Sequence, residues 1–376
     1  MPKPFDVIVL GLGAMGSAAA YALAQRGVRV LGLEQFDIAH DRGSSHGRSR
    51  VIRKAYFEDP RYVPLLHRAY DMWRELEQAS GVELMRLNGC LNIGPADHAC
   101  ILGARHSVEQ HGLAYEVLDA PEIHRRWPGL RPDDDDIGLY ESEGGFLIPE
   151  RAVKLHVDLA RAAGAVIHTG EAVRRWIASS GGVSVQTDDG RYVGGQLMIT
   201  AGAWLANVAA EFHLPLRVER QVQTWFEPKV EDVFTAQHMP VFIHFLADRA
   251  YYGIPMTKNE GMKVARHHGG RITTADAINR EVTEEDEVDV RSYLANHLPD
   301  ANGKLLAAQV CMYTNTPDDH FIIDRHPNHA NVLIAGGFSG HGFKFSPVVG
   351  QALADLAIDR RTDLPIGLFS IHRLTA

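Results

Sequence analysis

The chain begins with a glycine-rich turn between an apolar run and an Ala-rich segment of helical pattern. The turn reads Gly11-Leu-Gly13-Ala-Met-Gly16, after residues 5–10 and at the start of a helix predicted over 14–26. Gly11 allows the tight turn, Gly13 lets the backbone approach a pyrophosphate, and Gly16 lets helix and strand pack closely. The N-terminus of the helix then stabilises phosphate charge. The pattern therefore predicts a β-α-β unit that binds a dinucleotide.

The second strand of this unit ends in an acid. Residues 28–34 form an apolar run that closes on Glu34, 18 residues after Gly16. A carboxylate at this place accepts hydrogen bonds from ribose hydroxyls and disfavours a 2′-phosphate. FAD and NAD are therefore both preferred over NADP, and the fingerprint alone does not separate them. An ordinary β-α turn is the plain alternative to a nucleotide site.

The remainder of the chain mixes helices with strands. Helical patterns cover 61–80, 120–127, 150–164 and 347–358, and strand patterns cover 84–93, 166–169, 183–186, 196–200, 220–226, 240–245, 250–254, 262–265 and 331–335. Polar and apolar residues alternate in several pieces between 216 and 324, which predicts an antiparallel sheet. The run Asp133-Asp-Asp-Asp136 is expected to be a solvated loop.

These patterns predict an α/β plus α+β fold. A Rossmann-like nucleotide-binding domain is expected to be discontinuous, with a β-sheet-rich substrate domain inserted into it. We assign residues 1–85, 148–215 and 325–376 to the first domain, and residues 86–147 and 216–324 to the second.

Composition excludes several classes of function. The length of 376 residues allows two domains, and the net charge of −9 argues against a surface for nucleic acid or anionic membranes. No apolar run reaches the ~18 residues that span a bilayer, and the first residues lack the apolar region of a signal peptide. Cys90, Cys100 and Cys311 are too few for a disulfide framework and lack metal-ligand spacing. We expect a cytoplasmic protein without a metal site.

Four further segments carry polar or glycine-rich patterns. They read Gly43-Ser-Ser-His46-Gly-Arg-Ser-Arg50-Val-Ile-Arg53, Tyr251-Tyr252-Gly-Ile-Pro followed by Gly261-Met-Lys263-Val-Ala-Arg-His267, Cys311-Met-Tyr313-Thr-Asn-Thr-Pro, and Gly336-Gly-Phe-Ser-Gly340-His-Gly342-Phe-Lys344. Taken singly, they have plain interpretations: a solvated basic loop, a strand lysine facing solvent, a small buried cysteine and a lysine after a turn.

Together and in this order, the segments resemble the monomeric sarcosine oxidase family. These FAD-dependent amine oxidases include N-methyl-L-tryptophan and pipecolate oxidases and belong to the D-amino-acid-oxidase-like superfamily. The resemblance implies FAD, attached covalently from the Cys311 thiolate to the 8-methyl carbon of the flavin, for which a positive neighbourhood is needed. Cys90 and Cys100 match nothing in the pattern and are expected to be structural. The implied cofactor-binding residues are Gly11, Gly13, Gly16, Glu34, Arg50, Val173, Cys311, Gly340, Gly342 and Lys344.

The resemblance also implies roles in catalysis and substrate binding. Lys263 is expected beside the flavin, where a fixed cation stabilises the anion formed when O₂ accepts an electron. Arg53 and Lys344 are expected to bind a substrate carboxylate, with the arginine able to do so through two parallel hydrogen bonds. The implied catalytic residues are Lys263, His46, Arg50, Tyr252 and His267. The implied substrate-binding residues are Arg53, Lys344, Tyr252, Tyr313 and His267.

The expected reaction is oxidation of a secondary amino acid. A hydride equivalent passes to the flavin, the imine hydrolyses, and O₂ is reduced to H₂O₂, so the partners are a small secondary amine and O₂, with a monomer expected. Ser45 and Arg48 depart from the bacterial sarcosine oxidase pattern, so sarcosine itself is not specified. A flavin amine dehydrogenase, a fructosyl-amino-acid oxidase and a non-catalytic sensor are the alternatives. An NAD-dependent dehydrogenase would leave Cys311 and the second glycine cluster without a role.

Overall fold

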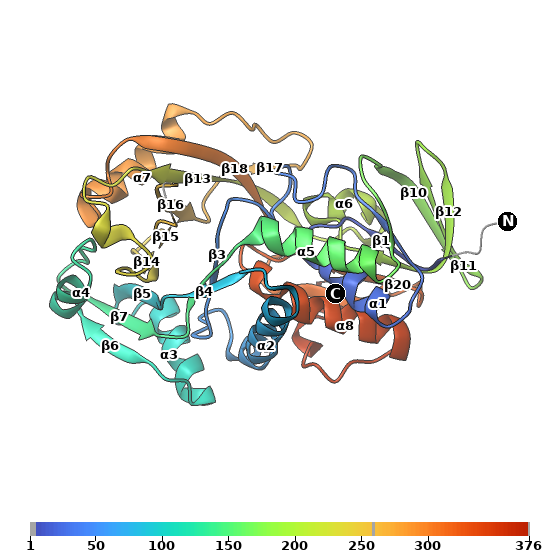
Figure 1. The fold of residues 1–376 in the computed structure, drawn as a ribbon, viewed down its shortest axis with the longest axis horizontal. Helices are drawn as coiled ribbons and strands as arrows, with labels where there is room; N and C mark the ends of the chain where they lie inside the picture. The colour runs from blue at the N-terminus through green and yellow to red at the C-terminus, as the bar shows by residue number, and fades with distance from the viewer. Residues whose placement is uncertain (1–4, 258–259, 375–376) are drawn as a thin grey trace.

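The protein is described here by a computed structural model that covers residues 5–257 and 260–374. Its long axis runs from a part built on one sheet with helices against it to a part built on a second, larger sheet (Figure 1). The first and last strands of the chain both belong to the first sheet, so the two ends of the chain meet there.

The first sheet has a parallel centre. Strands β9 (Val166–His168), β2 (Val30–Leu33), β1 (Phe5–Leu10), β12 (Arg191–Ile199) and β20 (Val332–Gly336) are neighbours in this order. Antiparallel additions to this sheet are β10 (Val173–Ser179), β11 (Gly182–Thr187) and β19 (Ile322–Arg325). The central strands are buried, as their apolar runs predict.

Three long helices pack together beside this sheet. Helix α1 (Ala14–Gln25) contacts both α5 (Pro149–Ala162) and α8 (Ser346–Asp359). A Cβ at Gly350 would lie 2.9 Å from the Ala18 side chain, so small residues set the close approach of α1 and α8. This packing fixes α1, and with it the glycine-rich turn that precedes the helix.

The second sheet has nine strands and is mostly antiparallel. Its order is β17-β13-β16-β15-β14-β5-β7-β6, with β18 also paired to β13. The bounds are β5 (Cys90–Pro95), β6 (Glu116–Asp119), β7 (Asp136–Glu141), β13 (Arg217–Phe226), β14 (Val241–Phe245), β15 (Ala250–Ile254), β16 (Met262–His267), β17 (Ile272–Thr273) and β18 (Leu305–Asn315). Helices α3 (Ala99–His111), α4 (Ala120–Arg126) and α7 (Glu284–His297) accompany it (Figure 1).

A small third sheet lies between the other two. It contains β3 (Arg50–Ile52), β8 (Gly145–Leu147) and β4 (Met85–Leu87). The remaining helices are α2 (Val63–Ser80), α6 (Leu205–Val208) and the 3-10 turns η1 (Pro60–Tyr62), η2 (Gly202–Trp204), η3 (Ala210–Phe212), η4 (Asp232–Phe234), η5 (Phe343–Phe345), η6 (Gly367–Phe369) and η7 (Ile371–Leu374). Within the described ranges, every helix is too short or too polar to cross a membrane.

Two expectations from the sequence are corrected. The strand predicted over 84–93 is two strands, β4 and β5, because Gly89 turns the chain with a φ of +88°. The run Asp133–Asp136 is not wholly solvated: Asp136 begins β7, is buried, and lies 2.9 Å from His244 Nε2. The division into two domains stays a prediction, and its outermost residues, 1–4 and 375–376, lie outside the described residues.

Candidate active site

A cavity of about 810 Å³ is lined by both ends of the chain and by the second sheet. The predicted site residues in its wall are Gly11, Gly13, Glu34, Arg50, Arg53, Val173, Tyr252, His267, Cys311, Tyr313, Gly340, Gly342 and Lys344. Gly16, His46 and Lys263 are not part of this wall. The chain therefore brings the nucleotide fingerprint and the C-terminal segments to one cavity.

The nucleotide end of the cavity is built around the turn between β1 and α1. Gly11 has a φ of +82°, and a Cβ there would lie 2.7 Å from the Thr200 carbonyl oxygen. At Gly16 a Cβ would lie 1.8 Å from the Gly11 carbonyl oxygen, so close packing requires glycine. Glu34 accepts the Leu12 N–H at 2.8 Å. The first turn of α1 carries no acidic side chain, which leaves its N-terminus able to bind an anion.

Cys311 lies in β18 beside a group of positive side chains. Its Sγ is 3.5 Å from Nη2 of Arg50. Burial alone would raise the pKa of the Cys311 thiol, but His46, Arg50 and Lys263 outweigh burial and lower this pKa to about 6. The two ring nitrogens of His46 are buried and have no hydrogen-bond partner among the described residues. Cys311 is therefore a thiolate at neutral pH and a competent nucleophile.

Lys263 is buried in β16 rather than exposed on a strand face. Its ammonium donates to the carbonyl oxygens of Gly47 at 2.9 Å and Ser49 at 3.0 Å, and lies 5.3 Å from the ring centroid of Trp225. Burial first, and then the charge of Arg50, lower the pKa of Lys263 well below its ordinary value. The loop before β3 therefore lies over this lysine.

Two buried cations line the wall where a substrate carboxylate was predicted. Arg53 Nη2 donates to both carboxylate oxygens of Glu58, each at 2.8 Å, and Nη1 donates to the Ala55 carbonyl at 2.7 Å. The Lys344 ammonium donates to the His341 carbonyl oxygen at 2.6 Å. Burial, followed by the charge of Arg53, lowers the pKa of Lys344 to about 7. Arg53 thus already has a counter-ion, whereas no carboxylate of the described residues forms an ion pair with Lys344.

Aromatic and imidazole side chains complete this end of the cavity. The Tyr313 hydroxyl is 3.1 Å from His267 Nδ1, and the ring centroids of Tyr252 and His267 are 6.4 Å apart. Burial, and next His268, lower the pKa of His267 well below its ordinary value, so this imidazole is neutral. A Cβ at Gly340 would lie 2.5 Å from the Tyr313 ring, which explains the glycine there.

Sequence reasoning missed several residues of the site. Glu58 binds Arg53, His341 binds the Tyr56 hydroxyl at 2.5 Å, and Glu150 accepts two N–H groups of the loop over Lys263. The contacts of His341 and Glu150 join residues far apart in the sequence, so no local pattern indicates them. Glu58 is the exception, because it stands five residues after Arg53, and this spacing was the one local signal.

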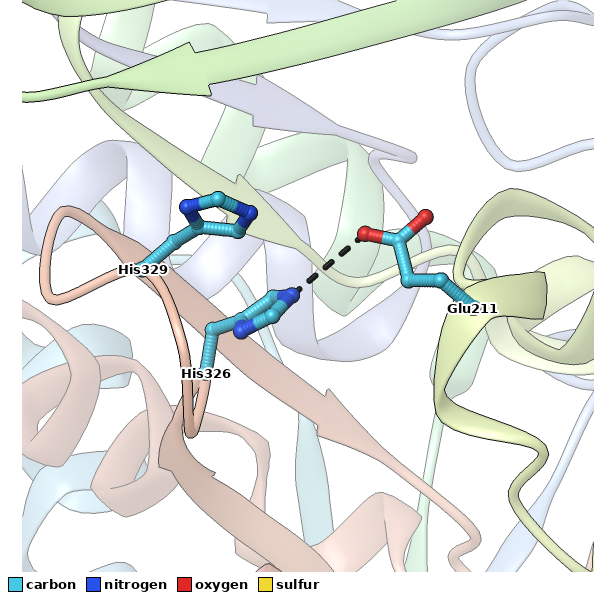
Figure 2. Close-up of side chains that lie close together, drawn as sticks. All are labelled: Glu211, His326 and His329. Carbon is cyan, nitrogen blue, oxygen red and sulfur yellow. Dashed lines mark hydrogen bonds and ion pairs between the residues drawn. The ribbon is translucent and has the colours of Figure 1, made fainter.

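A separate cluster lies near η3. Figure 2 shows Glu211, His326 and His329, whose ligand-type atoms lie within 4.8 Å of one another. His326 Nδ1 accepts the Asn328 N–H at 2.9 Å, so a neutral ring carries its proton on Nε2, which is 3.4 Å from Glu211. A metal bound at Nε2 would require the ring proton to be on Nδ1. Nδ1 could then no longer accept the Asn328 N–H, and two donors would face each other. The arrangement is therefore better explained as a hydrogen-bonded group.

Comparison with known proteins agrees with this geometry. Residues 6–356 match the family of FAD dependent oxidoreductases. The chain belongs to this family. Monomeric sarcosine oxidase of Streptomyces avermitilis is 44% identical over 100% of this chain and 99% of its own length. N-methyl-L-tryptophan oxidase of Salmonella arizonae is 35% identical over 99% of each chain.

Solved structures share the fold of this FAD dependent oxidoreductase. NikD, an amino acid oxidase of nikkomycin biosynthesis, has a TM-score of 0.87 at 23% identity, with 98% of this chain and 97% of that chain covered. L-proline dehydrogenase from P. horikoshii has a TM-score of 0.86 at 22% identity, with 99% and 98% covered. The family cofactor, FAD, fits this site. The α1 N-terminus suits a diphosphate, Glu34 lines the cavity, and the buried ring nitrogens of His46 have no hydrogen-bond partner among the described residues.

Proposed function

We propose that this chain, a flavin-dependent amine oxidase, acts on a secondary amino acid such as an N-methyl amino acid or a cyclic imino acid. The CH–NH bond is oxidised to an imine, which water hydrolyses, and O₂ takes up two electrons and two protons to become H₂O₂. FAD supplies the carrier of these two electrons. The observation that carries the proposal is the pair of buried cations, Arg53 and Lys344, in the wall that also holds Cys311.

The two cations orient the substrate through its carboxylate. Lys344 can donate to a substrate carboxylate, because an ammonium carries three N–H groups and a single hydrogen bond joins this one to the described residues, at the His341 carbonyl oxygen. Arg53 forms an ion pair with Glu58. A substrate carboxylate therefore either binds Arg53 alongside Glu58 or displaces Glu58 from it. Burial and, to a smaller extent, repulsion by Arg53 lower the pKa of Lys344, and an anion bound between the two cations offsets that repulsion. Amines without a carboxylate should bind poorly.

The same cations favour the neutral amine, the form that can be oxidised. A protonated substrate amine would add a positive charge to a cavity that holds Arg50, Arg53 and Lys344. Desolvation and these like charges lower the pKa of a bound amine. His267, hydrogen-bonded to Tyr313, is held neutral by its lowered pKa and therefore adds no further positive charge to this wall.

On the oxygen side, Lys263 is assigned to stabilise the negative charge that develops as O₂ is reduced. Its ammonium is fixed by two carbonyl oxygens and is shielded from water. A fixed, buried cation is effective because it needs no reorganisation when the charge forms. His46 and Arg50 are assigned to the surroundings of the flavin ring next to Cys311, and covalent attachment through Cys311 is part of the proposal.

The remaining assignments are proposed on narrower grounds. Residues 1–85, 148–215 and 325–376 would form the FAD-binding domain, and 86–147 and 216–324 the substrate domain; the strands of the first and second sheets fall largely within these ranges. Three free cysteines fit a cytoplasmic protein. The name of the Streptomyces relative, monomeric sarcosine oxidase, supports a monomer.

Anaerobic mixing with candidate substrates tests the function. The flavin absorbance should bleach within seconds with one class among sarcosine, other N-methyl amino acids, pipecolate, proline and fructosyl amino acids. Readmitting air should restore the colour and release H₂O₂ in equal amount to the imine formed. Bleaching without reoxidation by O₂ would favour a dehydrogenase, and no bleaching by any compound would contradict the proposed substrate class.

A further inference from the structure

A single peptide group joins the half-buried Glu150 carboxylate and the buried Lys263 ammonium across the loop before β3. The peptide between Gly47 and Arg48 directs its N–H to Glu150 and its C=O to Lys263. The Arg48 nitrogen is 2.9 Å from Glu150 Oε1, and the Gly47 oxygen is 2.9 Å from Lys263 Nζ. The same carboxylate oxygen accepts the Gly47 N–H at 2.6 Å, and the same ammonium donates to Ser49 at 3.0 Å. Carboxylate, peptide and ammonium therefore form one chain of hydrogen bonds.

The backbone of this loop adopts conformations that need such support. Gly47 has a φ of +104° and Arg48, which has a side chain, has a φ of +64°. A left-handed conformation at a residue other than glycine is costly unless surrounding contacts hold it. Glu150 supplies those contacts from one side, at the first turn of α5, and Lys263 supplies them from the other. The two residues with positive φ, Gly47 and Arg48, are therefore the residues whose backbone binds Glu150 and Lys263.

Glu150 also acts on the charge of Lys263. The titratable or charged groups that face this ammonium are Arg48, Arg50, Glu150, Tyr252 and Cys311. Burial and Arg50 lower the pKa of Lys263, whereas Cys311 and Glu150 raise it. A sulfur in a thioether carries no charge, so attachment of FAD at Cys311 would leave Glu150 as the anion of this group. Bonds through a polarised peptide strengthen one another, which adds to the effect.

We propose that Glu150 is a positioning residue for Lys263, acting through the Gly47–Arg48 peptide to hold the ammonium charged and in place while O₂ is reduced. The inference rests on the oxygen role proposed for Lys263. It assigns to α5 a part in the oxidative half of the reaction.

Glu150→Gln separates charge from hydrogen bonding, because the amide keeps an acceptor oxygen. Anaerobic reduction by substrate should stay within about twofold of wild type. Loss of the anion lowers the pKa of Lys263, so the ammonium is lost at a lower pH. Reoxidation by O₂ should therefore slow about tenfold above that pH, as a shift of one pKa unit would give, and recover on acidification. Glu77→Gln is the matched control, because Glu77 likewise accepts two backbone N–H groups, from Leu84 at 2.7 Å and Met85 at 2.8 Å.

A second readout does not depend on turnover. The pH dependence of the Lys263 side-chain Cε chemical shift, measured by NMR on the holoenzyme and assigned with Lys263→Met, reports the charge of the amine directly. Its midpoint should move to lower pH in Glu150→Gln and stay in place in Glu77→Gln. If Glu150→Gln does not accumulate, Glu150→Asp replaces it. The shorter side chain keeps the negative charge but places it farther from Lys263, so the midpoint should shift in the same direction by a smaller amount.

The outcomes distinguish the two proposals. Reoxidation that is unchanged in Lys263→Met would remove the oxygen role of Lys263, a failure of the proposed function. Slow reoxidation in Lys263→Met, with Glu150→Gln equal to wild type in both reoxidation rate and Lys263 titration midpoint, would overturn the role of Glu150 alone. Equal slowing of reduction and reoxidation in Glu150→Gln would also overturn it, since that result indicates general damage.

Discussion

The ionisation of Cys311 decides how the cofactor is held at the scale of single residues. With a pKa lowered to about 6, the sulfur is an anion at pH 7 and can bond to an electrophilic carbon. Cys311→Ala should still bind FAD in the cavity but release it when the protein is precipitated with acid, while wild-type precipitate stays yellow. Cys100→Ala should behave as wild type, because Cys100 is absent from the cavity wall. Flavin retained by precipitated Cys311→Ala would place the linkage elsewhere.

Lys344 titrates near neutrality in the free protein, since burial and then Arg53 lower its pKa to about 7. The cation is present below this pH and is lost above it. The Kd of a small carboxylate such as acetate, measured by flavin difference spectra, should therefore rise as the pH rises through 7. In Lys344→Arg the cation persists and the rise should vanish, because a guanidinium does not titrate in this range. A Kd for wild type that is constant between about pH 6 and 9 would contradict the assigned role.

At the scale of elements, the contact between β1 and α1 leaves no space at Gly16. A Cβ there would lie 1.8 Å from the Gly11 oxygen and 2.5 Å from Thr200 Oγ1. Gly16→Ala should lower the free energy of unfolding by about 1–3 kcal/mol, as overpacking does, and weaken FAD loading because the turn must move. Urea unfolding and flavin-to-protein ratio measure both effects. Gly367→Ala, which meets no atom within 4 Å, should change neither.

Local sequence patterns were enough to predict most helices and strands, but they did not predict the contacts between these elements. The helix predicted over 347–358 is α8, Ser346–Asp359, because periodicity and flanking residues are properties of the segment itself. Asp136 looked like part of a solvated acidic run, since its partner His244 lies 108 residues away. Strand alternation favoured a Lys263 that faces solvent, but its ammonium binds the carbonyl oxygens of Gly47 and Ser49, which lie 216 and 214 residues away in the sequence. Chemistry at this site depends on such long-range pairs.

At the scale of the whole molecule, the parallel sheet brings the ends of the chain to one cavity. Strands β1 and β20 flank β12, so Gly11 and Glu34, which directly follow β1 and β2, share a wall with residues 311–314 of β18 and with the segment that follows β20. A cofactor that contacts both groups binds the folded chain and has no comparable site in the unfolded one. Its binding must therefore contribute to the stability of the whole molecule.

This linkage predicts a difference between covalent and dissociable flavin. In Cys311→Ala, each tenfold excess of free FAD above its Kd should add about 1.4 kcal/mol to the free energy of unfolding. In the wild type, attached flavin is already stoichiometric, so added FAD should leave the melting temperature unchanged. Thermal melts at rising FAD concentrations compare the two proteins. If the melting temperature of Cys311→Ala does not change with FAD concentration, although the flavin is bound, the cofactor does not hold the two ends of the chain together.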